Sequence, residues 1–252
     1  MSTLGGASAV AAATFRDLRR RPGLLLAAIA VAVLLLLLPD ICTRAVDESA
    51  ALGLQVGLST IGIFLVLAAG FAGLRAGAAE GDLGAAPEWR AAPLAPGAYV
   101  AGRFAGVLAT ATLLFAALAA FLVFAQIGLL RDEPPQAHVA AFAACAAIVA
   151  AAQFAAVGLL FATATSPQLA AVLFLATVVA GRTLVPEFAS RGGALAVVAA
   201  LFPDPARLDL SRELAFHRPV DGSACALALL AASLHAAACL IAASWTLRRR
   251  ET

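Results

Sequence analysis

Residues 16–40 read R-D-L-R-R-R-P-G-L-L-L-A-A-I-A-V-A-V-L-L-L-L-L-P-D, which is a cluster of arginines followed by an unbroken apolar run of about 15 residues. A helix that crosses the hydrocarbon of a membrane needs roughly 20 residues, so the flanks of this run must contribute to a span. A run of this length also fits the core of a signal peptide. However, charged residues crowd the region after it, and no small-x-small cleavage site stands there. We therefore expect a first membrane span at about 22–39.

The same apolar pattern recurs along the whole chain. Hydrophobic residues make up 63% and charged residues 13% of the 252 residues, against about half and a quarter in soluble domains. In lipid a helix satisfies its own backbone hydrogen bonds, so long apolar runs predict helices. We expect an all-α, polytopic membrane protein with six transmembrane helices. Its further spans are predicted at about 54–74, 100–130, 139–163, 169–186 and 223–247.

The arginines predict the orientation of these spans. Triple arginines stand at 19–21 and 248–250, and cytoplasmic loops of membrane proteins carry an excess of Lys and Arg. Six crossings place both termini in the cytoplasm, whereas a seventh would separate them. The high Ala and Arg content with no Lys indicates a bacterium with GC-rich DNA. We therefore expect the protein in a bacterial inner membrane.

Two shorter segments are predicted to lie at the membrane surface. Residues 8–21 fit an interfacial helix, with Val10, Phe15 and Leu18 facing lipid and Arg19, Arg20 and Arg21 near the phosphates. A disordered basic tail is the alternative. The apolar run 192–202 is too short to span, and we interpret it as a re-entrant or interfacial helix between spans five and six, within an extracellular segment at 187–221.

Several classes of site are excluded or disfavoured by composition. The net charge of +2 gives no reason to expect a nucleic-acid partner. All 17 basic residues are Arg, so a phosphate-binding loop with its lysine and a Schiff-base lysine are both excluded. No C-x-x-C, H-E-x-x-H or G-x-S-x-G motif occurs. We expect no cofactor, no metal and no enzymatic activity, so any ATP must be bound by another chain.

The segment 75–103 is the longest predicted cytoplasmic connection. An ordinary connector needs only a few residues, whereas this one combines mixed charge with an exposed aromatic residue and several prolines. Such a composition suits docking onto a soluble partner, and a solvated linker is the alternative. The candidate docking residues are Glu80, Gly81, Asp82, Glu88, Trp89, Arg90, Pro93, Leu94, Pro96, Tyr99 and Arg103.

Polar side chains inside spans are the remaining candidates, because polarity within the hydrocarbon is expensive and often functional. They are Gln126, Gln153, Arg182 and His235. We expect Arg182 to extend toward the outer interface, and Gln153 and His235 to hydrogen-bond between helices in a packing role. The pairs Gly53/Gly57 and Gly102/Gly106 have the spacing that permits close helix packing, but such spacings are expected by chance in a chain this rich in Ala.

Three sequence patterns together resemble a known family. They are Phe15-x-x-x-Arg19-Arg20-Arg21 before span one, Glu80-Gly81 followed by Pro93-Leu94-x-Pro96-x-x-Tyr99-Val100-x-Gly102-Arg103, and Phe202-Pro203-Asp204-Pro205-x-x-Leu208-Asp209-Leu210 before span six. With the basic tail, their order resembles the permease subunits of type-2 ABC exporters, of the short six-span kind similar to nitrous-oxide-reductase maturation permeases.

This resemblance implies a function and partners. The chain would be the permease subunit of an ATP-driven exporter, and the loop 75–99 would dock on an ABC ATPase subunit. Residues 8–21 would form a connecting helix, and Pro203, Asp204 and Asp209 would belong to the extracellular segment. A second permease copy, or a related permease, would complete a dimer in the lipid bilayer. The alternative is a non-transporting scaffold that recruits a cytoplasmic partner through residues 75–103.

Overall fold

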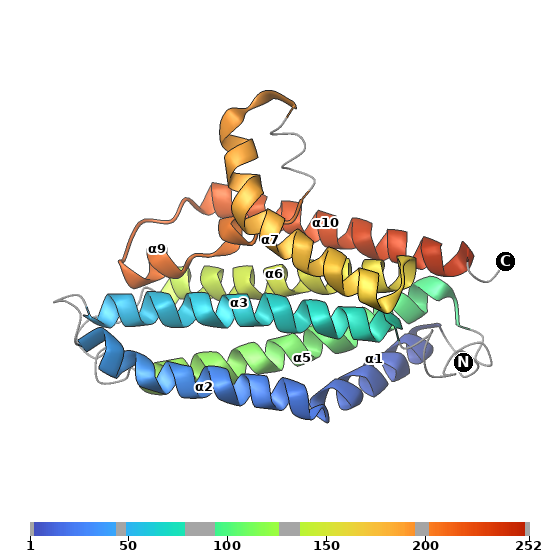
Figure 1. Cartoon of the computed structure of the whole chain (residues 1–252), viewed down its shortest axis with the longest axis horizontal. Coiled ribbons are helices and arrows are strands. Elements are labelled where there is room, and N and C mark those ends of the chain that lie inside the picture. The colour runs from blue at the N-terminus through green and yellow to red at the C-terminus, as the bar shows by residue number, and fades with distance from the viewer. Residues whose placement is uncertain (1–2, 44–48, 79–93, 126–136, 195–201, 250–252) are drawn as a thin grey trace.

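The described part of the chain is a bundle of long helices. The computed structural model describes residues 3–43, 49–78, 94–125, 137–194 and 202–249 (Figure 1). In chain order its elements are α1 (Thr3–Arg19), α2 (Pro22–Thr43), α3 (Ser49–Ala78), α5 (Pro96–Ala125), α6 (Ala137–Ala164), α7 (Pro167–Arg191), the 3-10 turn η1 (Pro205–Leu208), α9 (Ser211–Ala215) and α10 (Gly222–Arg249). The predicted all-α class is confirmed.

The helix lengths fit a multi-pass membrane protein. Helices α3, α5, α6, α7 and α10 are each long and apolar enough to cross a membrane. A sixth crossing arises if α1 and α2 are counted as one bent span, since Gly5–Arg19 and Pro22–Leu38 meet at 62°. The bend falls at Arg20 and Arg21, directly before Pro22, where a proline at the first helical position favours the start of a new helix.

Helix α7 runs beyond its predicted end. We expected span five to stop at Pro186, but the helix continues through this proline to Arg191 and ends at Gly192, whose φ is +69°. A proline removes one backbone hydrogen bond, and membrane helices tolerate this. Glycine adopts a positive φ without steric cost, so the helix ends there instead. The helix predicted over 192–202 falls mostly outside the described residues.

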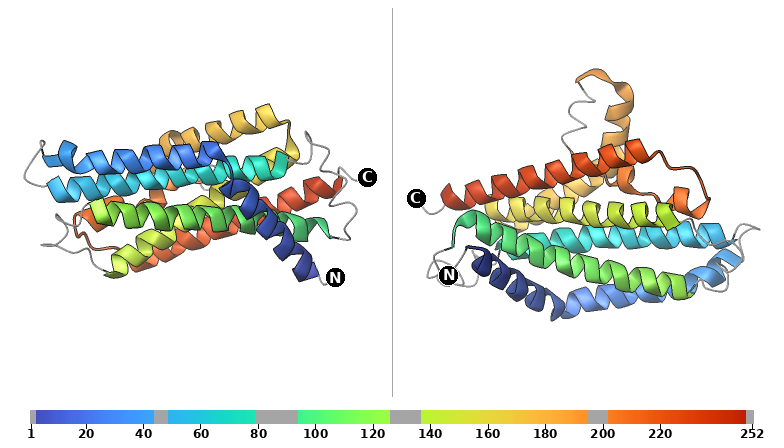
Figure 2. Two further views of the ribbon diagram at one scale, coloured as in Figure 1. Left: turned by 90° about the horizontal axis from the view of Figure 1, so that it is seen from below. Right: turned by 180° about the vertical axis from the view of Figure 1, so that it is seen from behind.

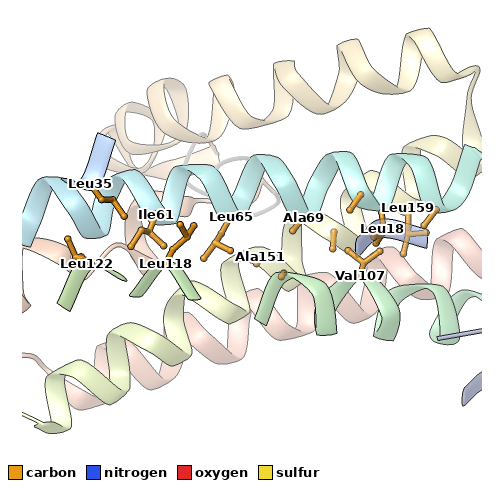
Figure 3. Close-up of a cluster of buried hydrophobic side chains, with 14 of the residues drawn as sticks. Leu18, Leu35, Ile61, Leu65, Ala69, Val107, Leu118, Leu122, Ala151 and Leu159 are labelled. Carbon is orange, nitrogen blue, oxygen red and sulfur yellow. The ribbon is translucent and has the colours of Figure 1, made fainter. Parts of the chain in front are cut away.

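Helix α3 lies at the centre of the bundle and touches α6 at backbone distance. A Cβ atom added to Gly73 would meet the carbonyl oxygen of Ala155, and one added to Gly158 would meet that of Gly70. Apolar side chains from α1, α2, α5 and α6 then pack along α3, among them Leu35, Leu122 and Leu159 (Figure 3). Glycines on both helices thus let the main chains approach, and side chains fill the remaining space.

Helix α1 packs along the first turns of α5 (Figure 2, left). A Cβ atom on Gly102 would meet the carbonyl oxygen of Ala7, and one on Gly106 would meet that of Ala11. Leu18 is 4% exposed and belongs to the main hydrophobic core, and Val10 packs against a second core cluster. The expectation that Val10 and Leu18 face lipid is therefore wrong, because the apolar stripe of this helix is covered by α5 instead.

The helices α2, α3, α5, α6 and α10 run roughly along one common direction, whereas the end of α7 rises away from them (Figures 1 and 2). The start of α1 and the end of α10 lie at the same end of the bundle, together with the end of α3 and the start of α5. We call this the terminal end. The opposite end carries the start of α3, the start of α6 and α9.

The close contact between α3 and α6 predicts a difference between two glycines of the same helix. Gly73→Ala places a methyl group against the backbone of α6, and overpacking of this kind costs about 1–3 kcal/mol. Gly62→Ala meets nothing within 4 Å, and it gains helix propensity. Thermal unfolding of the detergent-purified protein should therefore show a lower Tm for Gly73→Ala and an unchanged or higher Tm for Gly62→Ala. Equal Tm values would contradict the backbone contact between α3 and α6.

Candidate functional site

A cavity of about 270 Å³ lies between α3, α5, α6, α7 and the segment from η1 to α9. Its walls are largely apolar and come from Leu54 and Val66 on α3, Leu122 on α5 and several alanines of α6. Apolar cavities of roughly 150 Å³ stay dry and bind small apolar molecules, so one of this size is a candidate ligand site. Ile63 and Val123 line it and are 39% and 52% exposed, so the cavity reaches the lipid-facing surface.

One side of the cavity is polar and joins α3 to the segment that follows α7. The hydroxyl of Ser59 donates to Asp209 Oδ2 over 3.2 Å, and the Oγ atoms of Ser59 and Ser211 are 2.8 Å apart. The backbone N–H of Ser211 donates to Asp209 Oδ1 over 3.1 Å. These bonds hold the Asp209 carboxylate at the cavity wall, with acceptor capacity to spare, because a carboxylate has about four lone-pair sites.

Arg182 lines the same cavity from α7. Its side chain is exposed, and it forms no hydrogen bond or ion pair with any residue that the structure describes, Asp209 included. A positive and a negative side chain therefore border one largely apolar space without pairing with each other. The sequence-based expectation that Arg182 extends toward the outer interface remains a prediction.

The segment from Pro203 to Asp209 is held on the bundle by local bonds. Gly181 lets α7 approach the carbonyl oxygen of Pro203. Asp204 accepts a hydrogen bond from the backbone N–H of Ala206 and pairs with Arg207 at 3.0 Å. Asp204 therefore caps η1, while Asp209 supplies the polar side of the cavity, so the two predicted acidic residues have different roles.

Asp221 stabilises the start of α10 after this segment. Its Oδ1 accepts hydrogen bonds from the backbone N–H groups of Ser223 and Ala224 and from the Ser223 hydroxyl. Because these bonds favour the charged form, they lower the pKa of Asp221 below its ordinary value, with the Ser223 hydroxyl contributing most. This arrangement is a standard helix N-cap and gives α10 a defined beginning.

Gln153 of α6 and His235 of α10 form a hydrogen bond with each other; from the sequence we expected a bond between helices for each, without naming the partner. The amide nitrogen of Gln153 lies 3.1 Å from His235 Nδ1. An amide nitrogen only donates, so Nδ1 accepts and the ring proton is placed on Nε2, 4.0 Å from Cys239 Sγ. Gln153 is 4% exposed, and its Oε1 has no hydrogen-bond partner among the described residues.

A second polar group lies at the terminal end, where α1 meets α5. Arg103 donates to the Tyr99 hydroxyl over 2.9 Å and to Thr14 Oγ1 over 3.4 Å, and its guanidinium lies 5.1 Å from the centre of the Tyr99 ring. Tyr99 is 4% exposed. Tyr99 and Arg103 therefore help to fix α1 on α5.

The other predicted docking residues divide into two groups. Leu94 packs against Gly6 of α1, and Pro96 is the first residue of α5. Of the residues predicted for the interfacial helix, Phe15 on α1 is half-buried and Arg19 at its end is exposed. In the bend that follows, Arg20 is exposed and Arg21 pairs with Asp17 at 2.9 Å. The residues outside the described ranges are Glu80, Gly81, Asp82, Glu88, Trp89, Arg90 and Pro93 of the loop, and Gln126 of the predicted third span.

Ser59 and Ser211 were not among the candidate residues selected from the sequence. Neither serine belongs to a recognisable motif, and Ser59 lies within an apolar helix. Its partner Asp209 is 150 residues away along the chain, so no local spacing connects them. The signal that was available is a polar side chain inside a span, the criterion that selected Gln153 and His235.

The pair of Gln153 and His235 supports a prediction about stability. A double-mutant cycle with Gln153→Ala and His235→Ala should give a coupling energy of about 0.6 kcal/mol, the average for side-chain hydrogen bonds between membrane helices. Reversible unfolding in mixed micelles measures the four stabilities. Additive effects of the two substitutions would show that the bond contributes nothing.

Among the described residues no group of three or more His, Cys, Asp or Glu side chains is placed to hold a metal ion. Two candidate sites remain. The first is the cavity between α3, α5, α6 and α7 that Ser59, Arg182, Asp209 and Ser211 line, which we call the lateral cavity. The second is the junction of α1 with α5. A comparison with protein-family models and a search of curated proteins found no match to this chain.

Proposed function

We propose that this protein is the permease subunit of an ATP-driven exporter in a bacterial inner membrane. ATP would be hydrolysed by a separate ATPase subunit that docks on the cytoplasmic loop after α3. The sequence resemblance to type-2 ABC permeases motivates this proposal. The observation that carries it is the way in which the helices on either side of residues 79–93 are fixed.

Both flanking helices are locked to a neighbour close to this loop. On one side α3 ends at Ala78, and Gly77 lies against Ala162 and Leu159 of α6. On the other side α5 begins at Pro96 and is held to α1 through Gly102 and Gly106. A displacement of the loop would therefore move two helix pairs as units rather than bend single helices. Rigid-body movement of packed units is one of the ways in which proteins switch between states, and it would transmit ATP-driven movement at the loop to the bundle.

The arrangement of the helix ends also supports the proposal. The start of α1, the end of α3, the start of α5 and the end of α10 share the terminal end (Figure 1). Arg75, Arg103, Arg248 and Arg249 all belong to these helix ends. Arginine also occurs on α9 at the opposite end (Arg212) and at the bend after α1 (residues 19–21), so the assignment rests on the arginines beside short connections, which are enriched at cytoplasmic faces. We propose that both termini and the 79–93 loop face the cytoplasm.

The orientation predicts the outcome of reporter fusions. Fusions of alkaline phosphatase, which is active only outside the cytoplasm, should be inactive after Arg249 and active within residues 126–136, which connect α5 to α6 at the other end. A green fluorescent protein reporter should give the opposite pattern. Activity of both phosphatase fusions, or of neither, would contradict the proposed orientation.

The exporter function predicts ATP hydrolysis that depends on the loop. The full chain, tagged and purified in mild detergent from its own cells, should carry a co-purifying ATPase activity. Trp89→Ala combined with Arg90→Ala should reduce that activity per permease by about tenfold or more, the effect expected for removing interface hot spots. Arg131→Ala, which removes an arginine from the connection at the opposite end, is the matched control and should have no effect.

The same experiment separates the exporter from the scaffold. A partner that is retained in a loop-dependent way, without ATP hydrolysis, would favour the scaffold. Loss of activity in Arg131→Ala as well would point to general instability. ATPase activity that survives the double loop variant would contradict the assigned docking loop.

A further inference from the structure

The lateral cavity of one protomer has the chemistry of a lipid site. It lies within a single chain, so it does not depend on the dimer or on the ATPase of the proposed function. We infer that it binds one acyl chain of a zwitterionic phospholipid, with the lipid phosphate on Arg182 and the lipid ammonium on Asp209.

The walls select an apolar occupant. Apart from the four polar side chains already described, the cavity is lined by aliphatic residues and one phenylalanine, Phe115. Its volume of about 270 Å³ exceeds the roughly 150 Å³ of apolar cavities that stay dry and bind benzene. Water would find few partners along such a surface, whereas a hydrocarbon chain loses nothing there.

The opening selects an occupant that comes from the bilayer. The exposed wall residues Ile63 and Val123 lie on transmembrane helices, where the surrounding medium is lipid. An acyl chain can therefore enter sideways while its headgroup stays near the polar side of the cavity.

The headgroup is determined by Arg182 and Asp209, neither of which forms an ion pair with a residue in the described ranges. A guanidinium binds phosphate oxygens through two parallel hydrogen bonds, and a carboxylate with spare lone pairs accepts from an ammonium group. A purely anionic headgroup would satisfy Arg182 but stand beside the negative Asp209. A zwitterion with a primary ammonium satisfies both, so phosphatidylethanolamine fits better than phosphatidylglycerol.

Gly62 offers a way to block the cavity without disturbing the fold. It lines the cavity, and a Cβ atom added to it meets nothing within 4 Å. Gly62→Leu should therefore project its side chain into the open space. Gly23, in the first turn of α2, also has nothing within 4 Å of an added Cβ and does not line the cavity. Gly23→Leu is thus the matched control.

Native mass spectrometry of the delipidated full chain tests the inference. Phosphatidylethanolamine and phosphatidylglycerol with identical acyl chains are titrated separately, and the first adduct is quantified. The wild-type chain should bind phosphatidylethanolamine about tenfold more tightly, the effect of one charge-assisted hydrogen bond. Equal binding of the two lipids would mean unselective lipid at the surface and would overturn the inference without any variant.

The variants locate the bound lipid. Arg182→Gln should weaken both lipids by about tenfold, because both carry the phosphate. Asp209→Asn should abolish the preference for phosphatidylethanolamine, and Gly62→Leu should weaken both lipids while Gly23→Leu changes neither. Unchanged phosphatidylethanolamine binding by Gly62→Leu and Arg182→Gln, each eluting as the wild type does on size exclusion, would place the lipid elsewhere and overturn the inference.

Discussion

The contact between α3 and α6 is the constraint on which the rest of the bundle depends. Lipid is as apolar as the helix surfaces, so association needs close packing rather than burial from water. Gly73 of α3 and Gly158 of α6 provide it, because each leaves room for a carbonyl oxygen of the other helix. In their most apolar windows, 50% of α3 and 56% of α6 are buried, against 17–28% of the other three spanning helices. The remaining helices are therefore arranged around this pair and present most of their surface to lipid.

The packing of α3 against α6 also explains where the polar side chains of the spans lie. Gln153 lies on α6 and Ser59 on α3, and each reaches a partner on an element that packs against the pair. An unpaired polar group facing lipid would be costly, so polar residues within spans occur where a second element can meet them. Two of the side-chain hydrogen bonds between elements, Gln153 with His235 and Ser59 with Asp209, thus start from the two most buried of these helices.

The sequence predicted what depends on local pattern and missed what depends on distant partners. Apolar runs located the helices, and the polarity of Gln153 and His235 predicted that each bonds between helices, but not that they bond to each other. The apolar face of α1 was predicted correctly, but the sequence pattern of Val10 and Leu18 is the same whether lipid or protein covers that face. Pro186 was taken as a helix end because its stopping effect in water is strong, whereas neighbours in a membrane protein offset it. No sequence feature near Ser59 indicates that Asp209 is its hydrogen-bond partner.

The same helix connects the two candidate sites. α3 carries Gly77 beside the proposed docking loop, and Ser59 and Gly62 line the cavity nearer its other end. Since the backbones of α3 and α6 are in contact, we expect a movement at the loop to displace both helices together. The opposite wall of the cavity comes from α7, which rises away from the bundle and is only 22% buried in its most apolar window. The cavity therefore lies between the tightly packed pair of α3 and α6 and the loosely packed α7. We expect a movement of α7 relative to this pair to change the volume of the cavity.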